Sequence, residues 1–270
     1  MTEPIINSSE ISAGGIEYPV PWSQIHTIHP FTETFLVTSG IVLFLFTIVH
    51  KGKILSTPKQ LSWFITFFNS TILSFCSLFF IYDLIQNPSN LDRFGVSTPF
   101  SIVLTSFFVT TLFWDCVLGA IFYPGYIDLI TGWLHHVAIF LLCLTQFYCL
   151  MCPMEAPTIF LSLGSMNKKL RRDWIFGSLF FVTRIVYHLY SIITWYTLTG
   201  NTQLVAILIA FYPMHVIWFR GFILQQIRLF KNPHGDKKSQ TNNPLLNSFN
   251  GVDSANEERL KGYFKNDQTN

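Results

Sequence analysis

The residues best able to do chemistry are ionisable side chains that fall inside long apolar stretches. Asp115 lies in one such stretch, and the adjacent pair His135 and His136 opens the next. An imidazole acts as a general base or as a nucleophile when its pKa lies near the working pH and a carboxylate fixes its tautomer. Asp115, His135 and His136 are therefore the candidate catalytic residues, with one histidine reacting and Asp115 orienting it.

A structural role for the same residues is the alternative. Polar side chains in a membrane bundle often hydrogen-bond between helices without taking part in any reaction. On a helix, His135 and His136 point about 100° apart, so at most one of them faces a given partner. The residues alone leave the catalytic and the structural interpretation open.

A second set of ionisable residues falls further along the chain. Arg184 and His188 are four residues apart, so they share one face of a helix. Glu155 lies in the preceding segment and can pair with Arg184 if the two segments pack together. We expect Glu155, Arg184 and His188 to form a polar network that binds lipid or holds the bundle together. His215 and Arg220 are interpreted as bundle or interface residues.

No metal site and no resident cofactor are predicted. A metal centre needs several ligands that converge on one point, and His135-His136 is the only close histidine pair that sits in a spanning stretch. The remaining histidines are scattered without regular spacing: His26, His29, His50, His188, His215 and His234.

Composition indicates what kind of elements carry these residues. Half of the 270 residues are apolar, 28 are Phe, and only 12% are charged, whereas a soluble domain carries about 25%. Such a chain fits a bilayer, whose interior is itself hydrocarbon. The net charge of +2, without a basic and aromatic stripe, predicts no nucleic-acid partner. The expected partners are membrane lipids, and self-association is left open.

Apolar stretches near the roughly 20 residues that cross a bilayer as a helix predict an all-α polytopic bundle. The stretches are 33–50, 61–85, 98–123, 131–151, 174–198 and 203–225, with a shorter one at 153–167.

The distribution of Lys and Arg along the chain indicates whether the short stretch 153–167 crosses the membrane. The first 50 residues contain neither, while basic clusters occur at 51–59 and 168–172. Since cytoplasmic loops carry the excess of Lys and Arg, the N-terminus should be lumenal and both clusters cytosolic. This arrangement requires 153–167 to cross, which predicts about seven spans and a cytosolic C-terminus.

The chain then divides into three parts. Residues 1–32 are a lumenal segment in which Asn7 opens a glycosylation sequon. Residues 33–228 are the transmembrane bundle. Residues 229–270 are polar and are expected to be a disordered cytosolic tail.

Four sequence motifs, in this order, resemble the TLC domain. They are the Asp115 segment FWDCVLGAIFYP, the double histidine in GWLHHVAIF, the Glu155 segment MEAPTIFLSLGSM and the Arg184 segment FFVTRIVYHLY. The resemblance covers about 60–228. The TLC domain is the membrane domain shared by ceramide synthases, translocation-associated membrane proteins and many small TLC-domain proteins, and this chain is most similar to the last group.

The resemblance implies a protein of the endomembrane system, most simply the endoplasmic reticulum, that acts in lipid homeostasis and binds or senses acyl lipids within its bundle. Its alternative implication is a lipid N-acyltransferase similar to ceramide synthase, for which acyl-CoA would be the co-substrate. Ceramide synthases carry a His-His pair, matched by His135 and His136, and a later His-Asp pair that has no counterpart here. The sequence therefore leaves open whether the protein is an enzyme.

Overall fold

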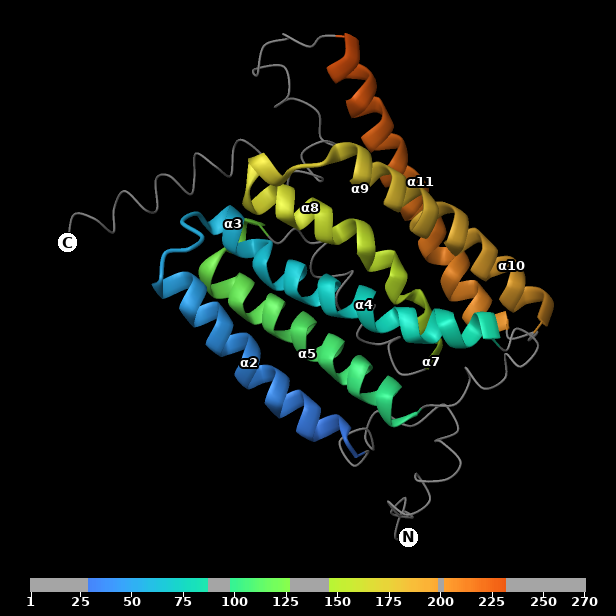
Figure 1. Cartoon of the computed structure of the whole chain (residues 1–270), viewed down its shortest axis with the longest axis horizontal. Helices are drawn as coiled ribbons and strands as arrows, with labels where there is room; N and C mark the ends of the chain where they lie inside the picture. The colour runs from blue at the N-terminus through green and yellow to red at the C-terminus, as the bar shows by residue number, and fades with distance from the viewer. Residues whose placement is uncertain (1–28, 87–97, 127–145, 199–201, 232–270) are drawn as a thin grey trace.

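The computed structural model describes residues 29–86, 98–126, 146–198 and 202–231, and these residues form helices and the turns between them (Figure 1). No strand occurs within these ranges, as the all-α prediction requires. The α-helices are α2 (Phe31–Lys51), α3 (Pro58–Ser62), α4 (Phe64–Gln86), α5 (Pro99–Phe122), α7 (Gln146–Met151), α8 (Ala156–Met166), α9 (Asp173–Phe180), α10 (His188–Leu198) and α11 (Thr202–Lys231). Short 3₁₀ turns η3 (Pro124–Tyr126), η5 (Cys152–Glu155) and η6 (Lys168–Leu170), and the π-helix η7 (Phe181–Tyr187), lie between them.

Six helical segments in the described ranges are long and apolar enough to cross a membrane. They are Phe31–Lys51, Pro58–Gln86, Pro99–Phe122, Cys149–Met166, Asp173–Thr197 and Val205–Lys231. These six match predicted spans, and together they have the character of an integral membrane protein. The other predicted span, 131–151, lies mostly outside the described residues, so seven crossings and the orientation of the termini remain predictions.

The segment 153–167 gains length from the residues before it. The helix α7 continues through η5 into α8, which makes Cys149–Met166 an 18-residue candidate span. Pro153 and Pro157 each fall in the first turn of η5 and α8. A proline is tolerated there because the first turn of a helix needs no N–H donor.

Two of the long helical segments begin at well-defined caps. The side chain of Thr57 accepts a hydrogen bond from the Gln60 N–H, and the side chain of Thr98 accepts one from the Ser101 N–H. In both cases the third residue of the helix bonds back to the cap, which completes a capping box that satisfies otherwise free backbone donors. Each cap is followed by a proline, whose fixed φ suits the first helical position.

The long helices lie side by side in a row (Figure 1). The helix α2 packs on α5, α5 on α4, α4 on α8 and α8 on α9, while α11 packs against η7 and α10. Phe46, near the end of α2, contacts Phe122 at the end of α5, so these two helices run parallel. Phe80, near the end of α4, contacts Phe100 near the start of α5, so α4 runs opposite to both. Each of these interfaces is filled mainly by apolar side chains.

The two basic turns lie at the same end of the bundle. The Gln60 side-chain nitrogen donates to the carbonyl oxygen of Met166 at 2.8 Å, which joins the start of the α3–α4 segment to the end of α8. The turn 51–57 and the turn 167–172 are therefore neighbours, and we call this end of the bundle the basic end. The geometry agrees with the expectation that both clusters face one side of the membrane.

Candidate functional site

The guanidinium of Arg184 is the centre of a buried polar network. Its Nε donates to the carbonyl oxygen of Met154 at 2.8 Å, and one terminal nitrogen donates to the Thr158 hydroxyl at 2.9 Å. The same nitrogen lies 3.4 Å from a Glu155 carboxylate oxygen, so the predicted ion pair is confirmed. The other Glu155 oxygen accepts a hydrogen bond of 2.8 Å from Ser70 of α4.

The π-helix η7 places Arg184 in this position. π-turns inside α-helices are rare and occur often at functional sites. Arg184 is the buried residue of η7, and its guanidinium also lies 5.4 Å from the Phe180 ring centre and 6.0 Å from that of Trp218. Aromatic faces stabilise a cation that has left water.

Most of the donors of Arg184 are already used by the chain. An ionisable group at membrane depth is costly unless it finds partners, and here the partners come from η5, α8 and, through Glu155, from α4. These hydrogen bonds connect α4, η5 and η7 to one another. The network therefore fits a structural role better than a lipid-binding role.

His188 is buried one turn beyond Arg184, as their shared helix face predicts. Its partner is His215, for which the sequence indicates only a role as a bundle or interface residue. Its Nδ1 lies 2.9 Å from Nδ1 of His215 on α11, and its Nε2 lies 3.1 Å from the carbonyl oxygen of Leu208. His215 carries the same signal that selected His188, an ionisable side chain at membrane depth. The sequence could not show which face of α11 would meet η7 and α10.

Asp115 lies near the basic end of α5, where it is buried. The hydroxyl of Tyr123, just past the end of the same helix, donates to its carboxylate at 2.9 Å. One turn earlier, the Thr111 hydroxyl donates to the side-chain oxygen of Asn69 on α4 at 2.7 Å. Two buried polar contacts therefore lie along this part of α5, of which the one from Thr111 to Asn69 joins α5 to α4. His135 and His136 lie outside the described residues, as does Asn7.

A groove runs between α2, α4 and α5 at the end of the bundle opposite the basic end. Its volume is about 400 Å³. Most of its lining is apolar, and Glu33 and Thr34 in the first turn of α2 add polar groups. The lining residues are Glu33, Thr34, Val37, Thr38, Ile72, Cys76, Phe100, Val103, Leu104 and Phe107.

Within the described ranges, no three His, Cys, Asp or Glu side chains gather in a way that would hold a metal ion. Comparison of the chain with known proteins gives no match to a family model, to a curated protein or to a solved structure.

Proposed function

We propose that this protein is a TLC-type integral membrane protein that acts in lipid homeostasis by binding acyl lipids in the groove between α2, α4 and α5. The observation that carries the proposal is the groove itself. Its volume of about 400 Å³ lies within the range of about 300–1,000 Å³ that is common for small-molecule sites.

An acyl chain is the occupant that best suits the groove. All three of its walls are candidate membrane spans, so the solvent around it is hydrocarbon. Val37, Val103 and Ile72 present aliphatic and partly exposed walls. The carboxylate of Glu33, at the first turn of α2, lies at the end where the head of a lipid would meet water, and it is paired there with His29 at 3.0 Å.

The family and the compartment are part of the same proposal. Asp115 and Arg184 are buried in the bundle and Glu155 is partly buried, in keeping with their places in the TLC-like motifs. Residence in the endoplasmic reticulum follows from that resemblance.

Quantitative lipidomics in cells that lack the protein tests the groove. The cells are rescued with wild type, with Val37→Trp/Val103→Trp, which fills the groove, or with Leu36→Trp/Ile121→Trp. Leu36 and Ile121 are exposed on the same two helices but do not line the groove, so they form a matched control. We expect wild type and the control, but not the groove-filled variant, to restore the altered lipid class. Full rescue by the groove-filled variant would refute the proposal.

The second candidate function is transfer of an acyl group from acyl-CoA to a lipid amine. The observation that favours it is the buried Asp115 at the basic end, where a soluble acyl-CoA would arrive from the cytosol. His135 or His136 would remove the amine proton, the amine nitrogen would bond to the acyl carbon, and coenzyme A would leave as its thiol. Asp115 would orient the histidine.

Rescue with His135→Ala/His136→Ala and with Asp115→Asn separates the two functions. Acyl transfer requires both variants to fail while they accumulate to the wild-type level, and purified protein must form amide from acyl-CoA. If both variants restore the lipid profile, the histidines are structural.

A further inference from the structure

The turn between α8 and α9 is built tightly against the end of α8. Asn167 accepts a hydrogen bond of 3.0 Å from the Lys169 N–H, which starts the single turn η6. Gly164 lies directly under Arg171, because a Cβ at residue 164 would come within 3.1 to 3.2 Å of the Cβ, Cα and Cγ atoms of Arg171. The glycine allows the backbone of Arg171 to lie on α8.

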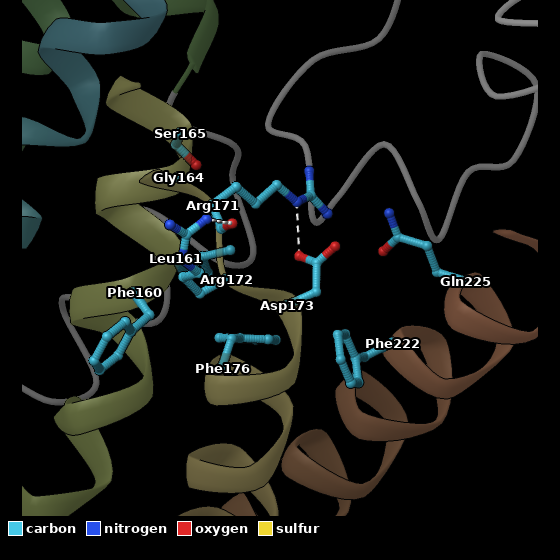
Figure 2. Close-up of a pocket in the computed structure, with 10 residues that line it drawn as sticks. All are labelled: Phe160, Leu161, Gly164, Ser165, Arg171, Arg172, Asp173, Phe176, Phe222 and Gln225. Carbon is cyan, nitrogen blue, oxygen red and sulfur yellow. Dashed lines mark hydrogen bonds and ion pairs between the residues drawn. The ribbon is translucent and has the colours of Figure 1, made fainter. Parts of the chain in front are cut away.

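A small cavity opens beside this turn, between α8, α9 and α11 (Figure 2). Arg171 reaches across it above Asp173, Gln225 approaches from α11, and Phe176 and Phe222 lie on the opposite side. Its volume is about 40 Å³. Since one water needs roughly 10–15 Å³ of such space, the cavity has the size of a small polyatomic group.

The charge around the cavity is strongly positive. Lys168, Lys169, Arg171 and Arg172 stand against one carboxylate, Asp173, so the five side chains carry a net charge of +3 (four cations minus one anion). Arg171 donates through Nε to Asp173 at 2.7 Å, which holds its side chain over the cavity. Within the residues that the structure describes, neither terminal nitrogen of Arg171 donates a hydrogen bond.

Further donors surround the same space. One terminal nitrogen of Arg172 donates to the carbonyl oxygens of Lys169 and Arg171 at 3.5 and 3.4 Å, both at the long limit for a hydrogen bond. The side chain of Gln225 supplies an amide. The lining thus combines the guanidinium groups of Arg171 and Arg172 and the amide of Gln225 with an apolar wall, and arginine suits a tetrahedral oxyanion because it offers two parallel N–H donors.

The position of the cavity indicates where that oxyanion comes from. The turn joins two candidate spans, Cys149–Met166 and Asp173–Thr197, so we expect it at the level of the headgroups. Trp174, directly after the cluster, is 72% exposed. Exposed tryptophans of membrane helices sit at the interface between lipid and water, and basic clusters beside a span attract anionic lipids.

We propose that the cavity between α8, α9 and α11 binds the phosphate of an anionic phospholipid headgroup, with Arg171, Arg172 and Gln225 as the donors. The site is separate from the groove between α2, α4 and α5, and it does not depend on the proposed function. A phosphate group could also come from a soluble phosphate, so the test distinguishes the two sources.

The experiment counts lipids bound to purified full-length protein by native mass spectrometry, with dioleoylphosphatidic acid and dioleoylphosphatidylcholine as the probes. Wild type is compared with Arg171→Gln/Arg172→Gln. The matched control is Arg228→Gln/Lys231→Gln, which removes the same charge from exposed residues of the last turn of α11. Gln225→Leu removes the amide without changing the charge.

We expect wild type to bind phosphatidic acid more tightly than phosphatidylcholine. The double arginine variant should lose about tenfold or more of the affinity for phosphatidic acid, Gln225→Leu a smaller factor, and the control almost none. Equal affinity of wild type and the double arginine variant would overturn the site. An equal loss in the control would show a general effect of charge and overturn it as well. Wild type that binds inorganic phosphate but holds phosphatidic acid no more tightly than phosphatidylcholine would assign the cavity to a soluble anion and refute the lipid.

Discussion

The Nδ1 atoms of His188 and His215 lie 2.9 Å apart inside the bundle, so a single hydrogen joins the two rings. The Nε2 of His188 faces the carbonyl oxygen of Leu208 at 3.1 Å, and a carbonyl only accepts. Neutral His188 therefore carries its hydrogen on Nε2, and its Nδ1 must accept from His215. The two neutral histidines adopt opposite tautomers.

Coupling between the two histidines is the first prediction. His188→Phe or His215→Phe alone leaves a buried ring nitrogen without its partner, so each should lower the free energy of unfolding by about 1–3 kcal/mol. The double variant should cost less than the sum, with a coupling of about 1 kcal/mol. Unfolding in mixed micelles measures all three variants. The exposed Tyr190→Phe is the control, and strictly additive losses would contradict a shared hydrogen bond.

Replacing only one residue of the Glu155–Arg184 pair should lower the free energy of unfolding more than replacing both. Arg184→Met leaves one Glu155 carboxylate oxygen and the Met154 carbonyl without their donor. Because Glu155 keeps its hydrogen bond from Ser70 and is partly exposed, we expect a loss of about 3 kcal/mol, the lower end of the range for buried pairs. Glu155→Met/Arg184→Met removes both charges and should be the more stable of the two. The comparison uses the same unfolding measurement, with the exposed Arg220→Met as control. A double variant less stable than Arg184→Met would show that the pair itself supplies the stability.

The hydroxyl of Tyr123 should stabilise the end of α5. Tyr123→Phe removes a donor from the buried Asp115 carboxylate while it keeps the ring, so unfolding should become easier by about 1–3 kcal/mol. Tyr196→Phe, which alters an exposed tyrosine, should change stability by less than about 0.5 kcal/mol. Equal stability of the two variants would mean that the hydroxyl of Tyr123 adds nothing.

Two glycines should respond in opposite ways to the same substitution. A Cβ at Gly177 would overlap the ring of Phe222, whereas a Cβ at Gly40 would meet nothing within 4 Å. Gly177→Ala should therefore destabilise by about 1–3 kcal/mol through overpacking, while Gly40→Ala should be neutral or stabilising by up to about 1 kcal/mol. Thermal unfolding of both variants is the measurement, and a tolerated Gly177→Ala would show that α11 can move away from α9.

The sequence predicts the spans well because crossing a bilayer demands a local property, an apolar run of sufficient length. The pairing of Glu155 with Arg184 was predictable for a related reason, since a charge at membrane depth must find a partner. Neither inference needs knowledge of how the helices are rotated against one another.

The sequence does not show how the helices are rotated about their axes or where their winding changes. The contact between His188 and His215 depends on the face that α11 turns toward α10, and a π-turn such as η7 leaves no mark in the 3.6-residue period. The helix that continues from α7 through Pro153 was likewise divided between two predicted spans at 151 and 153. The groove and the cavity under Arg171 are formed by side chains far apart in the sequence, so no single sequence motif predicts them.

The row of helices connects its parts in series. The helix α2 stands at one edge and α11 near the other, and the described helices between them meet in the order α5, α4, α8 and α9. A displacement that begins at the groove can reach the cavity under Arg171 through the contacts that α3 and α4 make with η5 and α8. Two hydrogen bonds lie in these contacts, one from Ser70 on α4 to Glu155 in η5 and one from Gln60 on α3 to Met166 on α8, so they contribute to how stiffly one half of the molecule responds to the other.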